Sequence, residues 1–207
     1  MAKKKLKILG IHGLGDHRNS TWEADWKRAL ESSFPGQESL ELSYSFLTYD
    51  VLFEKVDISA WEAMRAVWKL ARSGAANALG RRRGVVSNVS ERIKWTAGYV
   101  VAWLEDEDFK AKTRKLILDG ITQAEPDIIL AHSLGSLLTY NALIHPDSQS
   151  KNTADALRRA NYITLGSQLG NPFVTGTLAG GRLQPLPVRR RHHLFNRQDD
   201  VFTAPLR

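Results

Sequence analysis

The first half of the chain alternates short apolar runs with amphipathic segments. Residues 5–11 form an apolar run that ends in His-Gly-Leu-Gly at positions 12–15, which predicts a buried strand followed by a glycine-rich turn. A helix should follow, because Trp22 and Trp26 begin a stripe of apolar residues at helical spacing. Residues 39–49 alternate and are rich in leucine, tyrosine and phenylalanine, which predicts a second strand.

The middle of the chain, from about residue 57 to residue 107, has a helical pattern that we interpret as an insertion or cap. In its later part Trp95, Tyr99 and Trp103 recur every four residues, beside a second apolar stripe. A helix that is apolar on two sides is expected to be buried among other helices, or to line an acyl pocket as a lid.

The second half of the chain predicts strands and helices in alternation. The stretch from Gly166 to Gly181 holds five glycines in sixteen residues and predicts a loop. The alternation predicts one α/β domain over residues 1–207, with a mostly parallel sheet and helices on both of its faces. The expected segments are helices at 108–124, 134–145 and 153–160, and strands at 127–130, 162–165 and 193–195.

One serine stands where a buried strand turns into an amphipathic helix. The sequence Ile-Ile-Leu-Ala-His-Ser-Leu-Gly places Ser133 directly after the strand, with Ala131 two residues before it and Gly135 two residues after it. A strand-to-helix crossing this tight admits only small residues at those two positions, and it projects the serine into an open site. The pattern therefore predicts a nucleophilic serine, with alanine replacing the first glycine of the commonest form, G-x-S-x-G.

This elbow, together with the His-Gly turn after the first strand, resembles the α/β-hydrolase superfamily of serine esterases and lipases. The resemblance covers most of the chain and implies an α/β-hydrolase fold with a reduced sheet. It implies that Ser133 is the nucleophile and that backbone NH groups stabilise the oxyanion. Those NH groups would belong to Leu134 and Leu14, with Gly13 as the alternative to Leu14.

The same resemblance places a catalytic acid and a catalytic histidine after the nucleophile. Asp199 is the candidate acid, because its spacing before Val201 is similar to the acid turn of the family, and Asp200 is the alternative. No histidine occurs between Asp200 and Arg207. The family pattern therefore implies that a further strand and helix bearing the histidine would lie beyond Arg207.

The histidines within these residues are weaker candidates for the general base. Only His17, in the loop after the oxyanion turn, has a plausible route to the serine. His192 and His193 are expected at the start of the last strand, at the wrong end of the sheet. His145 should end the helix after the serine, far from it. His132 is expected to be a structural residue that points away along the buried turn.

The charge balance changes this picture little. Lysine and arginine number 29 against 22 aspartate and glutamate residues, which gives a net charge of +7. Such an excess favours anionic partners at long range, but it is also typical of a solvated surface. Neither a nucleic-acid recognition motif nor a phosphate-binding glycine pattern occurs, so we expect no specific nucleic-acid partner.

Other features bear on location. The chain has no cysteine, its N-terminus does not resemble a signal peptide, and no apolar run is long enough to cross a bilayer. These features favour a cytoplasmic protein without a transmembrane segment.

Together these features predict a serine hydrolase that cleaves carboxylic esters through an acyl-enzyme intermediate, with a small acyl compound as its substrate. This chemistry needs no cofactor. No metal site is expected either, since His192 and His193 are adjacent on a strand and point to opposite faces. The alternative, from a different class, is a hydrolase scaffold without its base that serves as an interaction domain. The pattern does not specify an oligomeric state.

Overall fold

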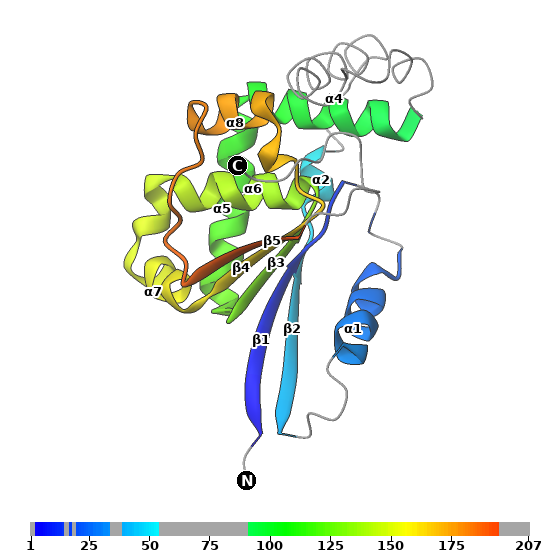
Figure 1. The fold of residues 1–207 in the computed structure, drawn as a ribbon, viewed down its shortest axis with the longest axis vertical. Helices are drawn as coiled ribbons and strands as arrows, with labels where there is room; N and C mark the ends of the chain where they lie inside the picture. The colour runs from blue at the N-terminus through cyan, green and yellow to red at the C-terminus, as the bar shows by residue number, and fades with distance from the viewer. Residues whose placement is uncertain (1–2, 15–16, 18–19, 34–38, 54–90, 195–207) are drawn as a thin grey trace.

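The chain folds around one parallel β-sheet, shown in the computed structural model of Figure 1. The part of the predicted insertion that runs from residue 57 to residue 90 lies outside the described residues. Both candidate acids, Asp199 and Asp200, lie outside them as well. The structure describes residues 3–14, 17, 20–33, 39–53 and 91–194.

Five strands make up the sheet, in the order β2-β1-β3-β4-β5, and every neighbouring pair is parallel. From β1 the chain first moves to β2 on one side, and then crosses β1 to reach β3 on the other side. This arrangement confirms the predicted α/β class and its parallel sheet. The strands are β1 (Lys4–Ile11), β2 (Leu40–Leu47), β3 (Ile128–His132), β4 (Asn161–Leu165) and β5 (Arg190–Leu194).

Helices lie on both faces of the sheet (Figure 1). Helix α1 lies on one face beside β2, whereas α5, α6 and α7 lie on the other. Right-handed crossovers explain the division, because the connection from β1 to β2 runs across the sheet in the opposite direction from the later connections. The helices are α1 (Trp22–Ser32), α2 (Asp50–Phe53), α4 (Glu91–Glu105), α5 (Glu107–Ala124), α6 (Leu134–Ile144), α7 (Lys151–Arg159) and α8 (Pro172–Ala179), with 3-10 turns η2 (Pro146–Gln149) and η3 (Gln168–Gly170).

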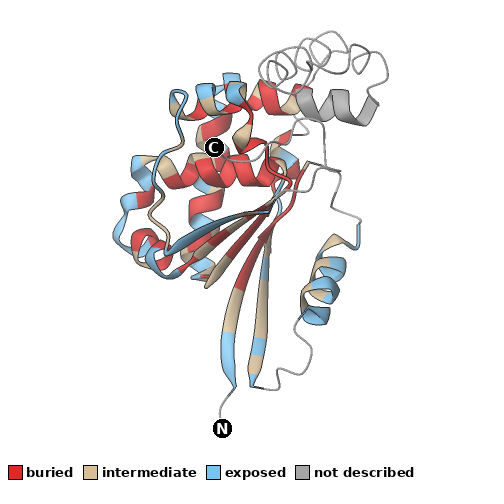
Figure 2. Cartoon of the chain, in the orientation of Figure 1, coloured by how far each residue is buried: buried red, intermediate tan, exposed pale blue. Residues whose placement is uncertain are grey.

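The core lies between the sheet and the pair of helices α5 and α6, where Figure 2 shows most of the buried residues. Leu134, Leu137 and Leu138 of α6 are fully buried, which confirms the apolar stripe predicted after Ser133. Because α6 is enclosed on nearly every side, the residue that precedes it is held by a rigid part of the fold.

The described part of α4 is buried on two sides. Val100, Trp103 and Leu104 are buried, Tyr99 packs against the core, and the helix contacts α5 and α8. The Trp103 indole Nε1 donates a hydrogen bond to Thr113 Oγ1 on α5 at 2.9 Å. The prediction of a helix enclosed by other helices is confirmed for these residues, and a role as a lid stays a prediction.

The glycine-rich stretch after β4 is not entirely a loop, and that prediction was wrong. Helix α8 lies within it, because Asn171 Oδ1 accepts the Phe173 backbone NH at 2.9 Å and Pro172 opens the first turn. Gly180, with a φ of 61°, ends the helix. Of the five glycines, only Gly176 lies inside the helix. The other four lie before or after it, so the glycine content of the stretch does not prevent a helix.

Among the described residues, none of the helices has the length and apolar character needed to cross a bilayer.

Candidate functional site

Two loops meet at the carboxyl ends of β1 and β3, where the strand order reverses direction. Open α/β sheets bind their ligands at such a reversal. The first loop begins at His12 and the second contains Ser133. They lie in contact, since a Cβ atom built on Gly13 would lie 3.0 Å from the Cβ of Ser133 and 2.8 Å from Nδ1 of His132. The structure therefore brings together two of the segments that the sequence analysis singled out.

Ser133 has an unusual backbone conformation, with φ of 49° and ψ of −122°. Non-glycine residues with positive φ of this kind cost on the order of 1–3 kcal/mol and collect at functional sites. The surrounding structure holds the strained residue in place. Its NH donates to the Leu165 carbonyl at 2.9 Å, and its carbonyl accepts from Ser136 Oγ at 2.5 Å.

The residues two before and two after Ser133 are small for a visible steric reason. Ala131 is fully buried in β3. A Cβ atom on Gly135 would lie 2.2 Å from the His12 carbonyl oxygen and 2.9 Å from Cγ2 of Ile11, so α6 begins directly against the end of β1. The close crossing that the sequence pattern predicts is present at Ser133.

The predicted oxyanion donors lie on both sides of this contact. Leu134 is the first residue of α6, and the first NH groups of a helix have no acceptor within it. Leu14 follows Gly13 in the loop after β1 and packs partly against the core. The two candidate segments are neighbours, which an oxyanion site requires, and their role in catalysis stays a prediction.

Gln168 is a site residue that the sequence analysis missed. It begins η3 after β4, its side chain is buried, and its Nε2 donates to Ser133 Oγ at 3.3 Å. The Oγ atoms of the neighbouring Ser167 and of Ser136 share a hydrogen bond at 2.5 Å, which ties the loop after β4 to the first turn of α6. No local motif marks Gln168, because its relation to Ser133 arises only when β3 and β4 pair.

If Ser133 is the nucleophile of the expected ester hydrolysis, replacing Gln168 by methionine should lower its kcat about tenfold with little change in KM. Methionine keeps the side-chain length but removes the amide NH that holds the Ser133 hydroxyl, and one such hydrogen bond contributes roughly 1–1.5 kcal/mol. Steady-state kinetics measure both constants, with exposed Gln123 of α5 replaced by methionine as the matched control. An unchanged kcat would show that Gln168 does not position the serine.

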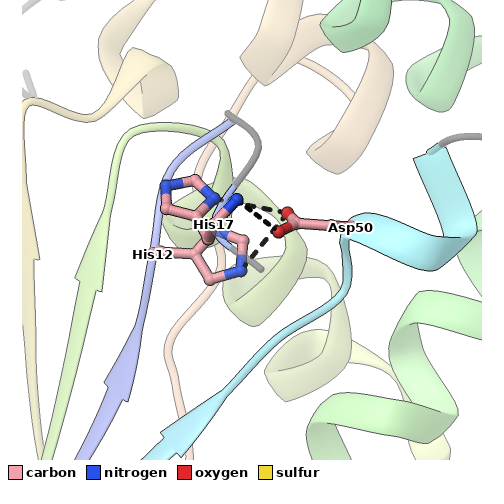
Figure 3. Close-up of side chains that lie close together, drawn as sticks. All are labelled: His12, His17 and Asp50. Carbon is pink, nitrogen blue, oxygen red and sulfur yellow. Dashed lines mark hydrogen bonds and ion pairs between the residues drawn. The ribbon is translucent and has the colours of Figure 1, made fainter. Parts of the chain in front are cut away.

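Three polar side chains converge beside the two loops, as Figure 3 shows. His12 directly follows β1, His17 lies farther along the same loop, and Asp50 begins α2 after β2. Asp50 Oδ1 lies 3.5 Å from His12 Nε2 and 3.3 Å from His17 Nδ1, while Asp50 Oδ2 accepts the His17 backbone NH at 2.9 Å. His17 was the one histidine with a plausible route to the serine, but its described side-chain contacts are with this cluster and Trp22.

His12 is almost completely enclosed, with 2% of its surface exposed. Its ring stacks between His17 and Tyr49, at centroid distances of 3.8 and 4.3 Å. Burial lowers the pKa of His12 below its ordinary value, and the Gly13 carbonyl raises it only in part.

The other histidines do not all lie where the sequence predicted. His145 ends α6 as expected, 3.1 Å from the Asp147 carboxylate. The placement of His192 and His193 at the wrong end of the sheet was incorrect. β5 already begins at Arg190, and pairing with β4 sets His193 beside Thr164 near the carboxyl end.

His132 also differs from its prediction. It was expected to lie along a buried turn, but the structure leaves it exposed as the last residue of β3. β3 is buried through Ala131, and the exposed His132 ends it directly before the turn at Ser133. A structural role in the interior is therefore excluded for this side chain.

Comparison with known proteins finds no matching family model, no similar curated protein and no similar solved structure. The class of this protein is therefore assigned from its sheet topology and from the conformation of Ser133. The chain is an open α/β protein with a five-stranded parallel sheet, and it carries a strained serine between a strand and a helix at the reversal of its strand order.

Proposed function

We propose that this protein is a serine hydrolase of the α/β-hydrolase type that acts on carboxylic esters of small acyl compounds. The observation that carries the proposal is the conformation of Ser133, a positive-φ serine at the point where β3 turns into α6. The close packing of Gly135 against the His12 carbonyl and the contact of Gly13 with Ser133 support it.

In the proposed reaction, Ser133 Oγ attacks the acyl carbon. The imidazole of the histidine that the family pattern places after the acid takes the hydroxyl proton. The NH groups of Leu134 and Leu14 stabilise the negative charge on the carbonyl oxygen. The bond to the alcohol then breaks, and the alcohol leaves with the proton from the imidazole. Water hydrolyses the acyl-serine in the same way and restores the enzyme. Asp199 is the proposed partner of the imidazole, and the chemistry needs no cofactor.

Pre-steady-state hydrolysis of 4-nitrophenyl esters by the full chain tests this proposal. Esters of graded acyl length should be hydrolysed with saturation, and the acid-quenched protein should carry one acyl group per chain by mass spectrometry. If no acyl length gives saturable hydrolysis or an acylated chain, the proposal fails. The catalytically incomplete interaction domain would then be the better account of the same scaffold.

A further inference from the structure

The cluster of His12, His17 and Asp50 has the character of a metal site rather than of an ordinary polar contact. Each residue contributes one ligand atom, and the three atoms lie within 4.8 Å of one another. Two imidazoles and one carboxylate form a donor set that zinc and similar metals prefer. We propose that these three residues bind one divalent transition-metal cation of the zinc type.

The first argument comes from the tautomer of His12. Its Nδ1 faces the Gly13 carbonyl oxygen, which can only accept, so Nδ1 must carry the hydrogen. In the neutral ring, Nε2 then presents a lone pair, and it lies 3.5 Å from Asp50 Oδ1, another acceptor. His12 Nε2 is buried and has no hydrogen-bond partner among the described residues. A metal cation bound between these two buried atoms would satisfy the lone pairs of both.

This is the arrangement that metal-bound histidines have in general. A ligating histidine usually donates its second ring NH to a backbone carbonyl or a carboxylate, which fixes the ring and the tautomer. For His12 the Gly13 carbonyl fills that role. Asp50 is fixed in the same manner, since its Oδ2 accepts the His17 backbone NH at 2.9 Å, while its Oδ1 faces both imidazoles.

The distances also suit a tetrahedral ion. Two ligand atoms about 2.0–2.1 Å from zinc, at the tetrahedral angle, lie about 3.3–3.4 Å apart. Asp50 Oδ1 lies 3.5 Å from His12 Nε2 and 3.3 Å from His17 Nδ1. All three ligand atoms lie within 4.8 Å of one another, and Figure 3 shows Asp50 in contact with both histidines.

The surroundings favour a tightly held ion with one open position. Trp22 packs edge-on against His12 and His17, and Tyr49 stacks on His12. The side chain of His17 retains 17% exposure, so solvent reaches the cluster from that side. Water is the expected fourth ligand.

A metal in this place would hold the loop after β1 at two points. His12 and His17 flank Gly13 and Leu14, the loop that contacts Ser133, and Asp50 anchors them to α2. Metal binding itself does not depend on the proposed function, and a chain with Ser133→Ala should bind the metal as the wild type does. The link to the oxyanion loop rests on that function.

Zinc titration of the full, untagged chain, stripped with a chelator, tests the proposal in competition with a chromophoric chelator. We expect one equivalent of Zn²⁺ per chain, and Co²⁺ in the same site should show the intense visible absorption of a four-coordinate ion. Asp50→Asn and His17→Gln should each lower the affinity by about 100-fold or more. The control is His145→Gln, which alters a histidine 3.1 Å from Asp147 and should bind zinc as the wild type does.

Thermal melting shows whether each variant is folded, so a lost metal site can be distinguished from a lost fold. Zinc should raise the melting temperature of the wild type and of His145→Gln, and should leave Asp50→Asn and His17→Gln unchanged. The proposal is overturned if the folded wild type shows no saturable binding of Zn²⁺ or Co²⁺. It is also overturned if the variants of Asp50 and His17 bind as tightly as the wild type, because the metal would then lie elsewhere.

Discussion

Replacing Ser133 by alanine should lower ester hydrolysis by the full chain at least about 10³-fold. Removing the nucleophile of a serine hydrolase leaves only the contributions of substrate binding and the oxyanion donors. Hydrolysis of the best 4-nitrophenyl ester, measured under saturating substrate, gives the ratio of rates. Ser32→Ala provides the matched control, since Ser32 is exposed at the end of α1 and, among the described residues, its hydroxyl bonds only the Ala29 carbonyl.

A second substitution at the same position separates catalysis from folding. Ser133 has positive φ, which glycine adopts without strain, so Ser133→Gly should be inactive yet about 1 kcal/mol more stable than Ser133→Ala. Chemical denaturation measures the difference. Full activity in either variant would exclude Ser133 as the nucleophile, and equal stability of the two would show that the backbone strain is absent in solution.

Replacing Gly135 by alanine should lower the free energy of unfolding by about 2 kcal/mol or more. The added Cβ would lie 2.2 Å from the His12 carbonyl oxygen and 3.0 Å from that of Ile11, and backbone atoms cannot move aside without shifting α6 from β1. Activity should fall as well, because the same shift separates Ser133 from the loop that carries Leu14.

Gly176→Ala is the control for this prediction. Gly176 is also a helical glycine, in α8, and nothing lies within 4 Å of the position that its Cβ would take. Alanine is the better helix former by up to about 1 kcal/mol, so this variant should be as stable as the wild type or more stable. If Gly135→Ala were tolerated equally well in urea denaturation, the close crossing of α6 and β1 would not exist.

The parts of the site that follow each other along the chain could be predicted from the sequence. The strand, the turn at Ser133 and the helix after it are local features, and so are the small residues Ala131 and Gly135. The parallel sheet could be predicted because apolar strands alternate with helical stripes. The helix inside the glycine-rich stretch was missed, since the helix-starting pair Asn171-Pro172 carries more information there than the number of glycines.

The contacts that depend on strand order and register could not be predicted. Asp50 reaches His12 and His17 only because β2 pairs with β1, and the sequence between them shows no motif. Gln168 reaches Ser133 because β4 lies beside β3. One sequence by itself does not show which strands become neighbours. Contacts between side chains at the edge of the sheet therefore cannot be predicted from it.

The proposed function depends on Ser133 as a reactive nucleophile, and the most direct measurement is the position of a covalent adduct. The full chain would be treated with a fluorophosphonate, digested and mapped by mass spectrometry, with Ser133→Ala treated in parallel. We predict one adduct per chain, on the peptide that contains Ser133, and none in the alanine variant. A folded wild-type chain that stays unmodified, or that is modified equally in the alanine variant, would contradict the account.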